Sequence, residues 1–223
     1  MTPRKRALFL INSLAGGGAE RVMCTLLRHS ETERDEFDIT LALLDDEPAA
    51  NTPPAWVNVR QLDCRFSLAR SVMEVGKLFA EIKPDVSVSF LIRANICNVL
   101  SARGSCVISE RADTATHFRP GTKGGFSKAL IRAIYPRATK VIAVSEGVAA
   151  GLRDKFSVPA DKLTAIANPV DAEAIGAKAA EAPGFDPGGP YVLAAGRMVP
   201  AKNFDVLIRA YAASGITPKL VIA

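Results

Sequence analysis

Strand-like and helix-like segments alternate along most of this chain, and this alternation limits its fold more than any other feature. Residues 7–12 form a continuous apolar run, which is typical of a central parallel strand buried on both faces. Residues 19–28 carry apolar side chains at helical spacing, and so do residues 68–82. The alternation predicts an α/β fold: a Rossmann-like, doubly wound parallel sheet with helices on both faces.

The same patterns place the remaining elements of the first domain. Further strands are predicted at residues 37–44, 56–62, 85–90, 105–109, 139–144 and 163–167. Further helices are predicted at residues 93–103, 126–135 and 146–155. Residues 111–125 are interpreted as a loop, and Ser145 as the amino-terminal cap of the helix that follows it.

A change of composition marks a domain boundary. Residues 171–189 are rich in Ala, Gly and Pro, which is typical of a linker between domains 1–170 and 190–223. The second of these contains only one βαβ, which is too small to bury a core of its own. We therefore expect a truncated second Rossmann-like domain.

The distribution of charge along the chain indicates what kind of partner it binds. The net charge of the chain is +5. Residues 103–155 hold ten Lys or Arg residues and four Asp or Glu residues, so the positive excess lies in this segment. We expect an anionic partner there, either a membrane surface or a phosphate-bearing acceptor. Nucleic acid is not expected, because stacking aromatics are not interleaved with these cations. The helix that begins at Phe126 could rest on a membrane or simply face the core.

Localisation is predicted from the cysteines and the chain start. Four scattered cysteines without CxxC spacing indicate buried free thiols in a reducing cytosol, and no metal site. No apolar run is long enough for a transmembrane helix. The first residues faintly resemble a signal peptide, but Asn12 and Ser13 interrupt the run, and we interpret it as a buried strand.

Two glycine-containing turns precede helices. Gly16, Gly17 and Gly18 could cradle a diphosphate at a helix amino end, although a plain tight turn explains them equally well. They are not a dinucleotide fingerprint, because Arg21 stands where the last glycine belongs. After the strand predicted at residues 191–195, Arg197 and Lys202 flank the next helix and could bind a leaving diphosphate, or be solvated surface cations.

A third cluster follows the strand at residues 105–109. Glu110 could act as a base on a substrate hydroxyl, and Arg111 could bind an acceptor phosphate. A local ion pair among Glu110, Arg111 and Asp113 is the alternative. On the acceptor side the candidates are Arg93, Asn95, Asp113 and His117, with a surface role more expected for His117.

Four motifs in order resemble glycosyltransferase family 4, whose members have the GT-B fold. They are LINSLAGGGAERV at residues 10–22, VIAVSEGV at 141–148, IANPVD at 166–171, and GR at 196–197 with KNFDVLI at 202–208. Together they extend across nearly the whole chain. Residues 1–170 would then be the acceptor-side amino-terminal domain, and residues 190–223 the start of the donor-binding domain.

This resemblance implies the chemistry of a sugar transfer. The family moves a sugar from a nucleotide donor, of UDP or GDP type, with retention and without a bound metal or other cofactor. Arg197 and Lys202 would hold the donor diphosphate, which the loop Gly16–Gly18 would approach from the facing domain. The acceptor would be lipid-linked or a polysaccharide, and the protein cytoplasmic or peripheral on the inner face of a membrane.

The chain departs from the family pattern in two places. Many relatives have a histidine after the strand at 105–109, where Glu110 and Arg111 stand here. The family's acidic E-x7-E motif would lie beyond Ala223, so these 223 residues alone are expected not to be catalytically competent. A non-catalytic, acceptor- or membrane-binding module remains the alternative, and a nicotinamide-dependent dehydrogenase is disfavoured because the glycine fingerprint is wrong.

Overall fold

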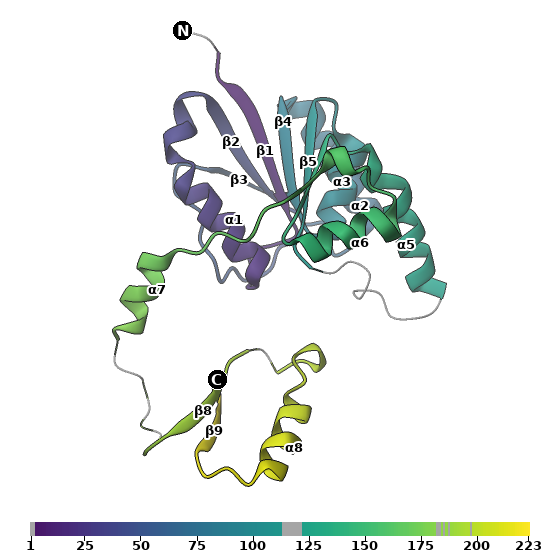
Figure 1. The fold of residues 1–223 in the computed structure, drawn as a ribbon. Helices are drawn as coiled ribbons and strands as arrows, with labels where there is room; N and C mark the ends of the chain where they lie inside the picture. Colours follow the sequence, from purple (N-terminus) through teal and green to yellow (C-terminus); the bar gives the residue numbers. More distant parts are fainter. Residues whose placement is uncertain (1–2, 113–121, 182–183, 185, 187, 197) are drawn as a thin grey trace. The chain divides into compact units, whose positions relative to one another are not determined.

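The chain folds into two compact units, Met1–Val170 and Asp171–Ala223, which are described separately below. The computed structural model describes residues 3–112, 122–181, 184, 186, 188–196 and 198–223, with only the backbone of residues 122–126 and 201. The first unit holds a parallel sheet, and the second is a βαβ preceded by a helix. Figure 1 shows the order of these elements along the chain.

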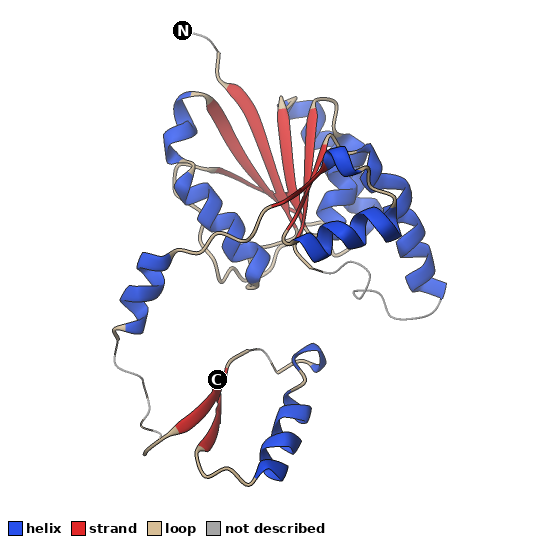
Figure 2. Cartoon of the chain, viewed as in Figure 1, coloured by secondary structure: helices blue, strands red, loops and turns tan. Residues whose placement is uncertain are grey.

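A seven-stranded, fully parallel sheet forms the centre of the first unit (Figure 2). Its strands are β1 (Lys5–Ile11), β2 (Phe37–Leu43), β3 (Asn58–Gln61), β4 (Val86–Phe90), β5 (Ser105–Glu110), β6 (Lys140–Ala143) and β7 (Leu163–Ala165). They lie in the order β3-β2-β1-β4-β5-β6-β7. The predicted doubly wound parallel sheet is confirmed, and the reversal of strand order lies between β1 and β4.

Helices connect successive strands of the sheet, except β2 and β3. The α-helices are α1 (Gly18–His29), α2 (Leu68–Ile82), α3 (Ile92–Ser101), α5 (Thr122–Ile134) and α6 (Glu146–Phe156). Short 3-10 turns are η1 (Glu31–Asp35), η2 (Tyr135–Arg137) and η3 (Ala160–Lys162). The Ser145 hydroxyl caps α6 by accepting a hydrogen bond from the amide of Val148, as predicted.

Strand β1 shows how both faces of the sheet are covered. Its residues Ala7 and Ile11 belong to a buried cluster with α1, whereas Leu8 and Leu10 belong to another with α2 and α3. Because successive side chains of a strand point to opposite faces, α1 lies across the sheet from α2 and α3. A third cluster joins α3, α5 and α6 to β5 and β6.

Two predicted segments differ from the structure. Residues 122–125, assigned to a loop, form the first turn of α5, although Gly124 and Gly125 disfavour a helix there. The predicted linker contains a helix, α7 (Ala172–Ala179), which Asp171 caps by accepting a hydrogen bond from the amide of Ala174. Its alanines favour a helix as much as a linker. The other elements match within a few residues.

The second unit continues with β8 (Tyr191–Ala194), η4 (Pro200–Lys202), α8 (Phe204–Ser214) and β9 (Lys219–Ile222). The strands β8 and β9 pair in parallel, as a βαβ requires. Most of β8 is exposed, with Leu193 54% exposed, whereas most of β9 is half-buried. Across the described part of the chain, no helix is both long and apolar enough to cross a membrane.

Candidate functional site

Most candidate residues of the first unit lie at one edge of its sheet. The loop Gly16–Gly18 follows β1, and Arg93 lies near the end of β4. Glu110 is the last residue of β5, and Arg111 is the next residue along the chain. Because all strands are parallel, their carboxyl ends meet at the same edge. This edge, at the reversal of strand order, is where ligands bind in sheets of this type.

The glycine loop has one position that requires glycine. Gly16 has φ +121°, and a Cβ there would lie 3.2 Å from the Cβ of Ala50. Gly17 is the extended residue that precedes α1, and nothing lies within 4 Å of a Cβ placed on Gly18. The backbone is therefore open to a ligand at Gly18, the first residue of α1, and restricted at Gly16 in the loop before it.

A carboxylate already lies beside the amino end of α1. The Glu20 side chain folds back so far that a Cβ on Gly17 would collide with its carboxylate. A negative group is favoured there by the helix dipole and the free amide groups of the first turn. A ligand diphosphate would compete with Glu20 for the same position.

Glu110 lies inside the protein at the end of β5. It is 2% exposed, and its Oε2 accepts a 2.7 Å hydrogen bond from the hydroxyl of Tyr135. Tyr135 is fully buried, and its pKa is raised well above the usual value by desolvation first and then by the Glu110 carboxylate. The tyrosine therefore stays protonated and acts as the donor.

Asn95 joins Glu110 to a larger buried network. Its amide nitrogen donates to the Tyr135 hydroxyl and to the carbonyl of Ser109, both at 3.2 Å. Its Oδ1 accepts from the Ser89 hydroxyl at 2.8 Å. With no exposed surface, Asn95 holds the interior together, and the structure does not place it where an acceptor could touch it. Tyr135 was not predicted from the sequence, because nothing in the local pattern distinguishes it from an ordinary core residue.

Arg111 bridges two loops at the carboxyl edge. Its Cζ lies 4.1 Å from the centroid of the Phe90 ring, and Nη1 donates a 2.7 Å hydrogen bond to Oδ1 of Asn168. Its Nε is buried without a partner among the described residues. Burial lowers the pKa of Arg111, although a guanidinium remains charged at any physiological pH. The unused donors can still bind an anion.

Arg93 is used by the protein itself. It forms an ion pair with Asp45, a residue that follows β2 and is 2% exposed. Oδ1 of Asp45 also accepts a 2.8 Å hydrogen bond from the amide of Phe66, and the Arg93 guanidinium lies 5.8 Å from the Phe66 ring centroid. Arg93 was predicted from the sequence for the acceptor side, whereas its partner Asp45, 48 residues away along the chain, was not.

The donor-side candidates belong to the second unit. Lys202 ends η4 just before α8, and its Cδ would lie 3.9 Å from a Cβ on Gly196, which has φ +153°. A hollow of about 530 Å³ opens beside this loop, lined by Met198 and Asn203 among others. Arg197, Asp113 and His117 lie outside the described residues.

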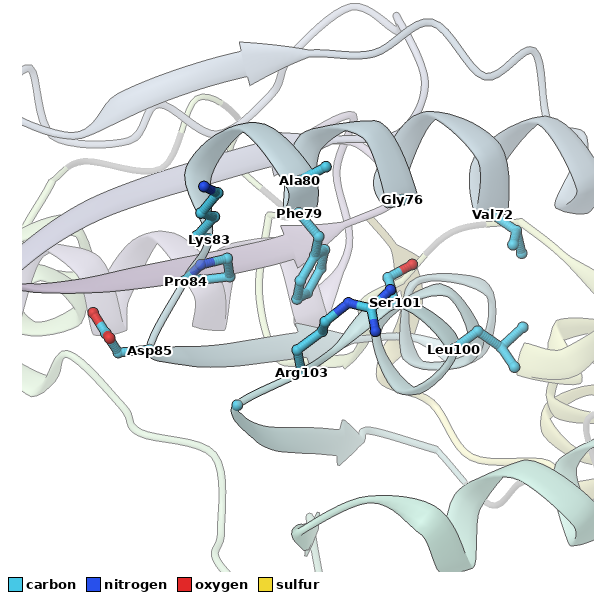
Figure 3. A pocket seen from close by; sticks show the side chains of 11 residues that line it. Val72, Gly76, Phe79, Ala80, Lys83, Pro84, Asp85, Leu100, Ser101 and Arg103 are labelled. Carbon is cyan, nitrogen blue, oxygen red and sulfur yellow. The ribbon is translucent and has the colours of Figure 1, made fainter.

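A groove without candidate residues lies at the opposite edge of the sheet. It measures about 710 Å³ between the ends of α2 and α3, with Lys83 before β4 and Arg103 before β5 (Figure 3). None of the candidate residues lines it. Within the described ranges, no group of three His, Cys, Asp or Glu side chains could hold a metal ion. All four cysteines are buried, as predicted.

The chain matches one family model and resembles one curated protein over most of its length. The family model described as Glycosyltransferase Family 4 matches residues 16–174. An N-acetylgalactosamine-N,N'-diacetylbacillosaminyl-diphospho-undecaprenol 4-alpha-N-acetylgalactosaminyltransferase from Campylobacter jejuni is 29% identical over 227 aligned positions, which cover 95% of this chain and 60% of that protein.

Solved structures share the fold at lower identity. Anabaena HepE, in complex with UDP and glucose, superimposes with a TM-score of 0.68 at 17% identity, covering 98% of this chain and 60% of its own. A UDP-N-acetylglucosamine 2-epimerase from Rickettsia bellii gives 0.62 at 10% identity, covering 99% and 62%. The fold alone therefore does not separate a transferase from an epimerase. The chain spans about 60% of the length of these relatives.

Proposed function

The chain belongs to glycosyltransferase family 4 and has the GT-B type of fold; on that basis we propose that its protein moves a sugar from a nucleotide donor to a lipid-linked or polysaccharide acceptor, with retention at the anomeric carbon. The match to the family model over residues 16–174 carries this proposal. The acceptor class rests on the Campylobacter relative, whose name describes a diphospho-undecaprenol acceptor.

The proposed donor site uses charges from the second unit. Arg197 and Lys202 hold the donor diphosphate and stabilise the negative charge that develops when the bond from the anomeric carbon to the diphosphate oxygen breaks. Because these two cations supply the positive charge, no bound metal or other cofactor is proposed. The backbone amides of the loop Gly16–Gly18 in the first unit are a second proposed contact for a diphosphate.

The proposed acceptor site uses the carboxyl edge of the first unit. Arg111 binds an acceptor phosphate through the donors that Asn168 leaves unused. Glu110 accepts a hydrogen bond from the acceptor hydroxyl and, as a base, takes its proton when the acceptor oxygen bonds to the anomeric carbon. Since Glu110 is 2% exposed, this contact requires that the residues covering its carboxylate move aside when the acceptor binds.

A membrane surface is proposed as a second partner. The ten cations of residues 103–155 would attract anionic lipids and bring the protein to a lipid-linked acceptor on the cytoplasmic face. The same cations would serve a non-catalytic binding module of this fold, which is the alternative function. A transferase turns over its sugar donor, whereas a binding module binds the acceptor without transferring a sugar.

The test is a transfer assay with the complete protein of the source organism. UDP- and GDP-activated hexoses and N-acetylhexosamines would be offered with an N-acetylhexosaminyl-diphospho-polyprenol, with and without EDTA. We expect transfer of one sugar with the donor's anomeric configuration and no loss in EDTA. Binding of the acceptor without transfer from any donor would refute the enzyme and favour the binding module.

A further inference from the structure

Phe66 presents an aromatic ring to solvent at the carboxyl edge of the sheet. The residue lies in the loop between β3 and α2 and is 68% exposed. Exposed phenylalanines are individually common, so exposure by itself decides nothing.

The backbone at Phe66 is held in a conformation that costs free energy. Its φ is +56°, in the left-handed region that bulky L-residues avoid, and Asp63 and Arg65 in the same loop also have positive φ. A glycine would adopt this conformation without strain, so the shape of the loop does not explain why a phenylalanine stands at this position. Strained residues of this kind gather at ligand sites.

The structure around Phe66 holds this strained conformation in place. Its amide donates to Oδ1 of Asp45 at 2.8 Å, and Asp45 in turn is paired with Arg93. The Arg93 guanidinium lies 5.8 Å from the centre of the ring, on one of its two faces. A 2%-exposed carboxylate therefore holds the Phe66 backbone, and a mostly buried guanidinium lies over its ring.

A hydrophobic staple at the start of α2 does not explain why the ring of Phe66 is exposed at this position. Phe66 immediately precedes Ser67, the amino-terminal cap of α2, and an apolar residue there often packs on the fourth residue of the helix. In this chain that fourth residue is Ser71, which is polar and bonds its hydroxyl to the carbonyl of Ser67. The ring has no apolar partner of this kind and stays exposed.

We propose that Phe66 is a stacking platform for a pyranose ring of the acceptor. An aromatic face carries partial negative charge, which suits the C–H groups on the apolar face of a sugar. The platform shares its edge with the glycine loop, since the amide of Asp45 bonds the carbonyl of Asn12 at the end of β1. This inference rests on the proposed transfer and names one contact that selects its acceptor.

The decisive variant is Phe66→Gly in the complete protein, with Phe66→Tyr to keep the ring. Glycine relieves the positive φ and removes little buried surface, so the melting temperature should hold or rise. The KM for N-acetylhexosaminyl-diphospho-polyprenol should rise about three- to tenfold, the range one aromatic contact supplies, with kcat and the donor KM nearly unchanged. Phe66→Tyr should restore the KM.

Met73→Ala is the matched control, because Met73 is also apolar, 52% exposed and on α2. It should leave both KM values unchanged. An acceptor KM for Phe66→Gly within twofold of wild type overturns the inference while the transferase stands. A fall in melting temperature with kcat and both KM values changed together indicates a structural role and overturns it too.

A binding readout separates this inference from the proposed function. If the wild-type protein transfers no sugar, saturation-transfer NMR with the methyl glycosides of N-acetylglucosamine and N-acetylgalactosamine tests the platform directly. Saturation of the sugar's ring protons that Phe66→Gly abolishes would support the platform although the transferase had failed. Equal or absent saturation in the two proteins would overturn the platform as well.

Discussion

The hydroxyl of Tyr135 lies 2.7 Å from Oε2 of Glu110, and both residues are buried. Tyr135→Phe removes the donor and leaves the carboxylate oxygen without this partner in the interior. An unmade hydrogen bond of this kind costs about 1–3 kcal/mol of unfolding free energy. Urea unfolding of wild type and variant, followed by circular dichroism, measures the loss.

Tyr211→Phe is the control for this prediction, because its hydroxyl donates to the carbonyl of Pro218 in the other unit. It should leave the unfolding of residues 1–170 unchanged. Equal stability of Tyr135→Phe and wild type would show that Glu110 does not depend on the tyrosine.

Removing only one partner of the Asp45–Arg93 ion pair should lower the free energy of unfolding strongly. Asp45→Asn keeps an acceptor for the Phe66 amide but leaves the guanidinium, 16% exposed, without its counter-charge. Breaking one partner of a buried pair costs about 3–5 kcal/mol. The double variant with Arg93→Met should lose less than the sum of the single variants in unfolding experiments, and strict additivity would contradict a coupled pair.

Two glycines of the loop after β1 should respond in opposite ways to alanine. Gly16→Ala places a methyl group at φ +121° and 3.2 Å from Ala50, and it should destabilise the protein by roughly 1–2 kcal/mol. Gly18→Ala meets nothing within 4 Å and should be neutral or slightly stabilising, because alanine favours a helix. Thermal unfolding measures both, and equal effects would refute the assigned strain.

Two buried thiols predict a loss of stability at high pH. Burial raises the pKa of Cys97 to about 12 and that of Cys106 to about 11. The unfolded thiols ionise near pH 9, so the folded state binds more protons above that pH and unfolding becomes easier. The stability from the neutral thiols is complete below pH 9 and is lost as the pH rises from 9 through 11 to 12.

By pH 10 this effect should reach about 1 kcal/mol for each thiol. Urea unfolding at pH 8 and pH 10 would measure it. The variant Cys97→Ala/Cys106→Ala is less stable at both pH values but should lose less between them. An equal loss in the two proteins would assign the pH dependence to other groups.

The sequence predicted the sheet well because parallel strands buried on both faces leave a direct signal. It also placed Gly16–Gly18 and Glu110 at one edge, since carboxyl ends of parallel strands coincide. It could not predict the partner of Glu110, because the reach of Tyr135 depends on how α5 and η2 are rotated against β5. A contact across 25 residues leaves no local pattern.

The pair of Asp45 and Arg93 was missed for a similar reason. Asp45 begins an acidic run with Asp46 and Glu47, and such a run after a strand is usually solvated. Only the backbone path of the loop before α2 brings the amide of Phe66 to Asp45. The exposed ring of Phe66 was also invisible, since apolar residues before a helix commonly staple it. Exposure is a property of the folded chain, which periodicity does not encode.

The central position of β1 has a consequence for biosynthesis. Its two neighbours, β2 and β4, leave the ribosome at different times, because β3 and α2 are made between them. At roughly 5–20 residues per second, one edge of the nascent β1 waits several seconds for a partner. Slow translation of the segment before β4 should therefore lower the yield of native protein, and a ribosome-associated chaperone that shields this edge should restore it.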